Sequence, residues 1–354
     1  MRQAWLAVPG DLESPTGGYA YARALLAEEG AGWHLRHLPL PGGFPDADDA
    51  LLADSRRLLQ ALPPDQPVLI DGLAYACLPP ALLSAIQPPC LALVHHPLAL
   101  ETGLSPERAA ALRTSEVAAL ALADGVVVTS PETARVLAAD YAVPQNAITV
   151  AEPGTRLPPS PATGGAERPE LLCVATISPR KGQETLVAAL ASLTDLDWHC
   201  RLVGSTEREP ASTRTLRQAI ADAGLQQRIT LTGALPADQV AACYAAADLF
   251  VLPSRYEGYG MAFAEALSWG LPVLACPTGA VPQTVPADAA LFVPPDDPTS
   301  LAVALRRVLT EPNLRQQKAT AAWAAGRRLP QWSDTAALVA AALDRAVEKK
   351  GKRA

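Results

Sequence analysis

The chain has 354 residues, of which 49% are hydrophobic and 18% are charged, a composition typical of a folded globular protein long enough for two domains and not of a disordered chain. The formal net charge is −7, and residues 1–166 contain nine arginines, no lysine and seventeen acidic residues. This acidic half disfavours binding to nucleic acid or to an anionic membrane surface.

The N-terminal residues run directly into a predicted strand and glycine loop, without a signal-peptide cleavage pattern. No apolar run reaches the roughly 18–20 residues that a membrane-spanning helix needs. We therefore expect a cytoplasmic protein. The six cysteines form no C-x-x-C pair and lie mostly in or beside apolar stretches, which favours buried thiols over a metal or redox site.

The first half of the chain alternates short apolar segments with helical patterns. Strands are expected at residues 3–8, 34–38, 68–70, 90–94 and 126–129, and helices at 19–29, 105–123 and 131–141. This alternation predicts a doubly wound parallel sheet, in which ligands bind at the carboxyl ends of the strands.

Three groups of residues follow strands of this predicted sheet. Gly17 and Gly18 come before the first helix, where backbone N–H groups could receive a phosphate, although a plain turn is the alternative. His95 and His96 follow strand 90–94, so one ring is expected at the ligand-binding edge and the other in packing. Glu101, a little further on, is either an acceptor contact or part of a surface loop.

We place the first domain at residues 1–157, a Pro- and Gly-rich linker at 158–169, and the second domain at 170–332. The second domain opens with a strand at 171–177 and then Arg180 and Lys181, followed by a helix at 183–193. A guanidinium fork and an ammonium at a strand-to-helix turn favour a diphosphate site over ordinary surface charges. Gly204 and Leu235 follow the next two predicted strands, 198–203 and 228–231.

The most informative stretch follows a buried strand predicted at residues 248–253. It contains Glu257, Gly258, Tyr259, Gly260 and Met261, and a helix is expected to begin at Met261. The glycines let a ligand approach the backbone, and the start of a helix favours an anion. Glu265 lies two turns inside the helix, about 12 Å from Glu257 at 1.5 Å per residue, which is the reach of a nucleotide sugar.

The stretch E-G-Y-G-M-A-F-A-E, together with the earlier R-K-G, resembles the E-x7-E signature and phosphate motif of retaining glycosyltransferases of family 4. The resemblance implies the GT-B architecture, an α/β fold in which two Rossmann-like doubly wound domains face each other across a cleft. It also implies that a last helix, at about residues 333–349, packs back on the first domain. The co-substrate would be a nucleoside-diphosphate sugar, with no further cofactor.

The resemblance also assigns roles to individual residues. Arg180 and Lys181 would bind the donor phosphates, Glu257 the sugar and Glu265 the ribose, while His95 would lie near the transferred sugar. The predicted catalytic residues are His95, Arg180, Lys181 and Glu257. The predicted donor-binding residues are Gly17, Gly18, Gly204, Leu235, Gly258, Tyr259, Gly260, Met261 and Glu265. The predicted acceptor-side residues are His96 and Glu101.

The sequence thus predicts a retaining hexosyltransferase with a UDP-sugar as the favoured donor. The cationic pair can stabilise a departing diphosphate and no D-x-D lies at a strand end, so no metal is expected. The lysine-free first half disfavours membrane docking and favours a small soluble acceptor, neutral or cationic, such as a pterin. A lipid or lipopolysaccharide acceptor is the alternative. A nucleotide-sugar epimerase and a non-catalytic nucleotide-sugar-binding protein are alternatives of other classes, and the oligomeric state is open.

Overall fold

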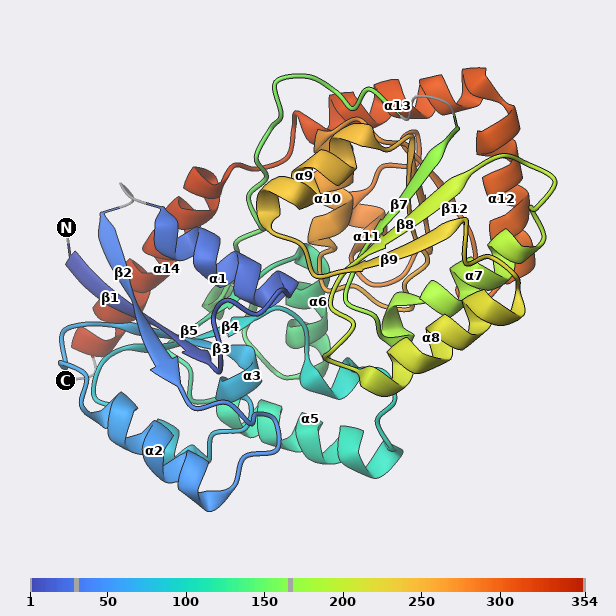
Figure 1. Cartoon of the computed structure of the whole chain (residues 1–354). Helices are drawn as coiled ribbons and strands as arrows, with labels where there is room; N and C mark the ends of the chain where they lie inside the picture. The colour runs from blue at the N-terminus through green and yellow to red at the C-terminus, as the bar shows by residue number, and fades with distance from the viewer. Residues whose placement is uncertain (1, 29–31, 165–167, 353–354) are drawn as a thin grey trace. The chain divides into compact units, whose positions relative to one another are not determined.

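The computed structural model describes residues 2–28, 32–164 and 168–352. Its internal contacts divide the chain into two units, residues 1–154 with 330–354, and residues 155–329. Each unit has its own hydrophobic core and its own six-stranded parallel sheet with helices against it (Figure 1). The predicted doubly wound α/β fold is therefore confirmed, once in each unit.

The first sheet has the strand order β2-β1-β3-β4-β5-β6. Its strands are β1 (Arg2–Pro9), β2 (Trp33–Leu40), β3 (Val68–Asp71), β4 (Cys90–Val94), β5 (Gly125–Val128) and β6 (Ile148–Val150). Its helices are α1 (Gly17–Ala27), α2 (Asp49–Gln60), α3 (Gly72–Tyr75), α4 (Pro80–Leu83), α5 (Pro106–Leu120) and α6 (Pro131–Asp140), with short 3-10 turns η1 (Leu98–Leu100) and η2 (Gln145–Ala147). All five residues of β4 are buried, as expected for a strand covered on both faces.

The strands of this sheet are parallel, and the direction of winding changes between β1 and β3, which are hydrogen-bonded neighbours. A crevice forms at the carboxyl ends of the strands where the winding of such a sheet changes direction, and ligands bind there. The loops after β1 and β3 flank this point, and β4 pairs with β3 beside them. The expected helix at 19–29 begins two residues earlier, at Gly17, and residue 29 lies outside the described part of the chain.

The C-terminal helix α14 (Trp332–Gly351) belongs to the first unit. The Trp332 ring lies edge-on to the Tyr21 ring at 5.4 Å, and a Cβ on Gly154 would lie 2.2 Å from the Trp332 backbone nitrogen. Residues 330–332 therefore lie in the first unit, whereas the sequence placed the end of the second domain at 332. Trp332 packs against Tyr21 of α1 and against Gly154, and these two contacts set the domain boundary.

The second sheet has the order β12-β11-β10-β7-β8-β9. Its strands are β7 (Glu170–Val174), β8 (His199–Val203), β9 (Ile229–Gly233), β10 (Leu249–Leu252), β11 (Val273–Ala275) and β12 (Ala290–Phe292). Its helices are α7 (Gln183–Ala191), α8 (Pro210–Asp222), α9 (Ala237–Ala246), α10 (Met261–Ser268), α11 (Val281–Thr284), α12 (Pro298–Thr310) and α13 (Pro312–Gly326), with a 3-10 turn η3 (Pro179–Lys181). Trp198, Phe250 and Phe263 are among its largest fully buried side chains.

The segment predicted to be an interdomain linker, residues 158–169, is hydrogen-bonded to the second unit where it is described. The Ala162 amide donates to the Trp269 carbonyl at 2.8 Å, and the Thr163 amide donates to the Ala245 carbonyl at 3.0 Å. Residues 165–167 lie outside the described part of the chain. Across the residues that the structure does describe, no helix combines the length and the apolar character needed to cross a membrane.

Candidate active site

In the second unit, the neighbouring strands β7 and β10 bring two distant loops together. The change of winding direction falls between these two strands, so the loops that leave their carboxyl ends meet at the point where such a sheet binds ligands. The Arg255 amide after β10 donates to the Arg180 carbonyl after β7 at 2.8 Å. Motifs that are 76 residues apart in sequence therefore form one local structure.

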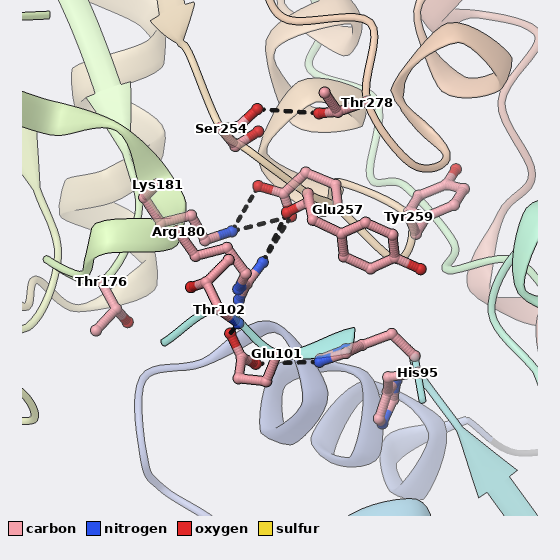
Figure 2. Close-up of polar contacts among 12 residues, drawn as sticks. His95, Glu101, Thr102, Thr176, Arg180, Lys181, Ser254, Glu257, Tyr259 and Thr278 are labelled. Atoms are coloured by element: carbon pink, nitrogen blue, oxygen red, sulfur yellow. Dashed lines mark hydrogen bonds and ion pairs between the residues drawn. The ribbon is translucent and has the colours of Figure 1, made fainter. Parts of the chain in front are cut away.

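Lys181 and Arg180 both point at the carboxylate of Glu257 (Figure 2). The Lys181 Nζ donates to Glu257 Oε1 at 2.7 Å and to Oε2 at 2.9 Å. The Arg180 Nη1 lies 3.6 Å from Oε2 and also donates to the Tyr256 carbonyl at 2.9 Å. The structure thus brings together Arg180, Lys181 and Glu257, three of the four residues predicted to be catalytic.

The electrostatics of this cluster keep Glu257 ionised. Burial alone would raise the pKa of Glu257, whose side chain is only 6% exposed. The positive charges of Lys181 and then Arg180, with the hydrogen bond from Lys181, outweigh that effect and lower the pKa below its usual value. Two cations against one carboxylate leave the cluster with one net positive charge, which suits an anionic ligand.

The backbone of Glu257 is fixed by the Thr278-Gly279-Ala280 turn. A Cβ on Gly279 would lie 2.2 Å from the Glu257 carbonyl oxygen, so only glycine permits this approach. That carbonyl accepts a hydrogen bond from the Ala280 amide at 2.9 Å. The turn therefore holds the glutamate in place.

The helix after Glu257 begins where the sequence predicted, with α10 starting at Met261 after Gly260. Gly260 has φ of +90°, and Gly258 is half-buried. Tyr259 is buried, and its carbonyl accepts a hydrogen bond from Thr284 Oγ1 at 2.8 Å. The first N–H groups of a helix have no acceptor within the helix, so this end of α10 presents donors and a positive dipole end beside the cationic cluster.

Glu265 lies within α10 and is half-buried. Burial raises its pKa, and a hydrogen bond with the Tyr244 hydroxyl offsets part of that increase. Tyr244, on α9, is buried, and its hydroxyl also lies within hydrogen-bond distance of the Ala262 carbonyl, at 3.1 Å. The sequence analysis missed Tyr244, because nothing in an alanine-rich helix marks one tyrosine as the neighbour of a glutamate twenty-one residues later.

The two residues expected after β8 and β9 differ in character. A Cβ on Gly204 would lie 1.9 Å from the Ala175 carbonyl oxygen, so the loop after β8 packs against the exit of β7 through backbone alone. The Gly204 amide donates to the Gly233 carbonyl at 3.0 Å. Leu235 is half-buried, and its side chain packs against the core of the unit.

In the first unit, the structure brings His95 beside the glycine loop. A Cβ on Gly18 would lie 3.3 Å from His95 Cδ2, while Gly17 is the first residue of α1. The His95 Nε2 lies 3.4 Å from Asp71 Oδ2, and the ring is edge-on to Tyr21 with centroids 5.4 Å apart. Of the two histidines, His95 is therefore the neighbour of the predicted phosphate loop.

The sequence analysis missed Asp71 and Arg23. Asp71 is the last residue of β3, at the same edge of the sheet as His95, and its position after an apolar strand was a usable signal. Arg23 on α1 donates to the carbonyls of Leu12 and Ser14 and so fixes the loop before Gly17. Parallel neighbouring strands end at one edge, which is why these side chains converge.

His96 and Glu101 form a separate pair. The His96 Nε2 lies 3.2 Å from Glu101 Oε2, and the Thr102 amide donates to Glu101 Oε1 at 3.2 Å. The two side chains are 22% and 40% exposed. Both residues predicted for the acceptor side thus lie next to each other at a partly exposed position.

Residues 168–311 match the protein-family model described as "Glycosyl transferases group 1". Among curated proteins, the chain is 38% identical over 129 residues to the GDP-mannose-dependent alpha-(1-6)-phosphatidylinositol monomannoside mannosyltransferase of Mycobacterium tuberculosis, a match covering 34% of this chain and 32% of that protein. It is 31% identical over 213 residues to the 2-deoxystreptamine glucosyltransferase of Streptomyces kanamyceticus, covering 55% of this chain and 53% of that protein. The matches span about a third to a half of these relatives.

Solved structures match the whole chain more evenly. Sucrose-phosphate synthase from Thermosynechococcus elongatus superposes with a TM-score of 0.78 at 22% identity, covering 94% of this chain and 96% of that one. Anabaena HepE, solved with UDP and glucose, gives a TM-score of 0.74 at 17% identity, covering 96% and 99%. The chain therefore has the GT-B fold, and its second unit carries a glycosyl transferases group 1 domain.

Proposed function

We propose that this protein is a retaining glycosyltransferase that moves a hexose from a nucleoside-diphosphate sugar to an acceptor hydroxyl without a metal ion. The observation that carries the proposal is the cluster of Arg180, Lys181 and Glu257 at the carboxyl ends of β7 and β10, inside the matched domain. It combines cationic donors, a buried ionised carboxylate and a helix N-terminus, which are the groups that a sugar diphosphate needs.

In the proposed reaction, the bond between the anomeric carbon and the diphosphate oxygen breaks, and its electron pair stays on the diphosphate. Negative charge develops on that oxygen, where Arg180, Lys181 and the start of α10 would stabilise it. The acceptor hydroxyl forms the new bond on the same face of the sugar, and its proton passes to the departing diphosphate oxygen. Because two fixed cations already serve the leaving group, a divalent ion has no required part.

The remaining residues receive roles consistent with their surroundings. Glu257 would bind sugar hydroxyls while it stays ionised between its two cations. Glu265 would accept hydrogen bonds from the ribose, beside Tyr244. His95 would contact the transferred sugar, with Gly17 and Gly18 near the diphosphate. Gly204 and Leu235 would lie next to the nucleotide base of the donor.

For the donor, we propose a UDP-sugar, with GDP-mannose as the competing candidate because the 38% identical relative is named for that donor. A thermal-shift screen of UDP-, GDP- and ADP-sugars tests this directly. A donor at 100 times its dissociation constant adds about 2.7 kcal/mol to the free energy of unfolding, a readily measured shift. Lack of any shift with all three classes would contradict the proposed function, and strict dependence of turnover on Mg²⁺ or Mn²⁺ would contradict the metal-free mechanism.

For the acceptor, we propose a small soluble molecule, neutral or cationic. The first 166 residues contain no lysine and carry a strong acidic excess, which repels anionic surfaces and attracts amines. The aminocyclitol named in the 2-deoxystreptamine relative belongs to this class, whereas phosphatidylinositol belongs to the lipid alternative. Product analysis with UDP-glucose or GDP-mannose and one acceptor of each class decides between them.

A further inference from the structure

Glu116 on α5 is a buried carboxylate that the proposed chemistry does not use. It is only 2% exposed, and its two oxygens accept hydrogen bonds from the backbone of another segment. The Leu98 amide donates to Oε1 at 2.8 Å, and the Ala99 amide donates to Oε2 at 3.3 Å. These are the first two residues of η1, whose N–H groups have no acceptor within the turn.

This contact fixes one side of the segment from His95 to Glu101. At the other end, the His95 carbonyl accepts from Thr129 Oγ1 at 3.2 Å. Beyond Ala99, the Glu101 amide donates to the Leu98 carbonyl at 3.1 Å and closes η1. The backbone that carries both histidines and Glu101 is therefore held by side chains from β5–α6 and from α5.

We propose that Glu116 is a positioning residue of the proposed active site, which fixes the backbone of residues 95–101 and thereby the side chains of His95 and Glu101. This rests on the proposed function, in which His95 contacts the transferred sugar, and on the acceptor-side role predicted for Glu101. An ionised carboxylate accepts both N–H groups at once, whereas a protonated carboxyl keeps one good acceptor oxygen. We call the two hydrogen bonds from the Leu98 and Ala99 amides to Glu116 the clamp. The clamp is therefore stronger when Glu116 carries its charge.

The charge of Glu116 changes near neutral pH. Burial raises its pKa to about 7, against the lowering effect of the two amide hydrogen bonds. The titratable and charged groups in this region are Cys77, which interacts with Glu116, the Arg108–Asp46 pair, which interacts with Cys77, and the His96–Glu101 pair on the held segment. Burial raises the pKa of Cys77 to about 11, so its thiol keeps its proton throughout the range in which Glu116 titrates.

The clamp is tested by amide hydrogen exchange of Leu98 and Ala99 between pH 6 and pH 8, corrected for intrinsic exchange. Over this range a group with a pKa near 7 goes from about one tenth to about nine tenths ionised. We expect protection of both amides to rise several-fold with pH in the unmodified protein. In Glu116→Gln it should be lower and independent of pH. Glu107→Gln, the same change at an exposed site on α5, is the matched control and should behave like the unmodified protein.

Steady-state kinetics provide a second test, which measures the effect of the clamp on sugar transfer. With UDP-glucose or GDP-mannose as donor, Glu116→Gln should lower kcat several-fold, leave the donor KM nearly unchanged and remove an acid limb near pH 7 from the rate profile. His96→Asn should retain that limb, which separates the effect of Glu116 from that of His96, the histidine paired with Glu101. Equal, pH-independent protection in the unmodified protein and Glu116→Gln would overturn the proposal. If neither donor is turned over, the donor assignment fails, while the exchange result still decides the clamp.

Discussion

Replacing Lys181 with Met tests whether the cationic cluster holds Glu257 in its ionised form. The substitution keeps most of the side-chain volume and removes the ammonium that lies 2.7 Å from Glu257 Oε1. It leaves a carboxylate that is 6% exposed, with the Arg180 guanidinium 3.6 Å away. A charge pair at about 4 Å has an interaction energy of about 4 kcal/mol at an effective dielectric constant of about 20. Breaking a buried pair costs about 3–5 kcal/mol, so we expect Lys181→Met to lower the unfolding free energy by about 3 kcal/mol at pH 8.

A double-mutant cycle isolates this interaction. Glu257→Gln should cost about 2–3 kcal/mol, because Lys181 and Arg180 then lie together without their counter-ion. The variant with both substitutions should be about as stable as either single one, which gives a coupling energy of about 2–3 kcal/mol. Urea denaturation followed by circular dichroism and tryptophan fluorescence measures all four proteins. Additivity within about 0.5 kcal/mol would refute the reasoning.

The pH dependence has a defined sign. The pKa of Glu257 is lower in the folded protein than in the unfolded chain, so the unfolded chain takes up the proton first as pH falls. The stabilisation is therefore fully present above the ordinary pKa of a glutamate and is lost as pH falls through the lower folded value. In Lys181→Met the Glu257 pKa should rise, so the destabilisation measured at pH 8 should shrink towards pH 5. A penalty that stays constant with pH would contradict this account.

Four further predictions follow from the same geometry. Arg180→Ala should lower kcat/KM for the donor by an amount that corresponds to about 2–4 kcal/mol of lost transition-state stabilisation, measured by steady-state kinetics. A near-normal kcat/KM would contradict the assignment of Arg180 to the phosphate site. Glu265→Gln should mainly raise the donor KM, whereas His95→Ala should mainly lower kcat. A lower kcat in Glu265→Gln with a higher donor KM in His95→Ala would contradict the ribose and sugar contacts proposed for these residues. Gly204→Ala should unfold or strongly destabilise the second unit, seen as a lowered Tm, because its Cβ would meet a backbone oxygen at 1.9 Å. Sedimentation with anionic liposomes at low salt should leave the protein in the supernatant, and substantial co-pelleting would favour the lipid acceptor.

Much of the fold could be predicted because parallel strands buried on both faces are continuous apolar runs. The strand expected at residues 90–94 is β4 with the same bounds, and the helix expected to begin at Met261 is α10. By contrast, α13 (Pro312–Gly326) was missed, because its buried face is made largely of alanine and glycine and gives no strong apolar period. Tertiary contacts set the boundary at residue 330, and no local pattern marks it.

The candidate site divides in the same way. Arg180, Lys181 and Glu257 were named from motifs, and the structure places them in contact. Asp71 was overlooked although it ends an apolar strand, whereas Glu116 was not found because it acts on a segment 18 residues away in sequence. A carboxylate that accepts backbone amides across such a distance has no sequence pattern, since its partners are the amides that every residue except proline carries. Supporting residues of this kind require coordinates.

The position of α14 within the first unit has a practical consequence for protein engineering. Residues 155–329 form an insertion in the chain of the first unit, and the two ends of the host, Gly154 and Trp332, touch each other. Adjacent host termini are the usual condition for excising or transplanting an inserted domain. A short bridge from residue 154 to residue 330 should therefore give a minimal host, and residues 155–329 a portable domain that carries the matched glycosyl transferases group 1 region. Chimaeras that exchange this insert between related chains would measure how far the proposed donor preference depends on residues 155–329.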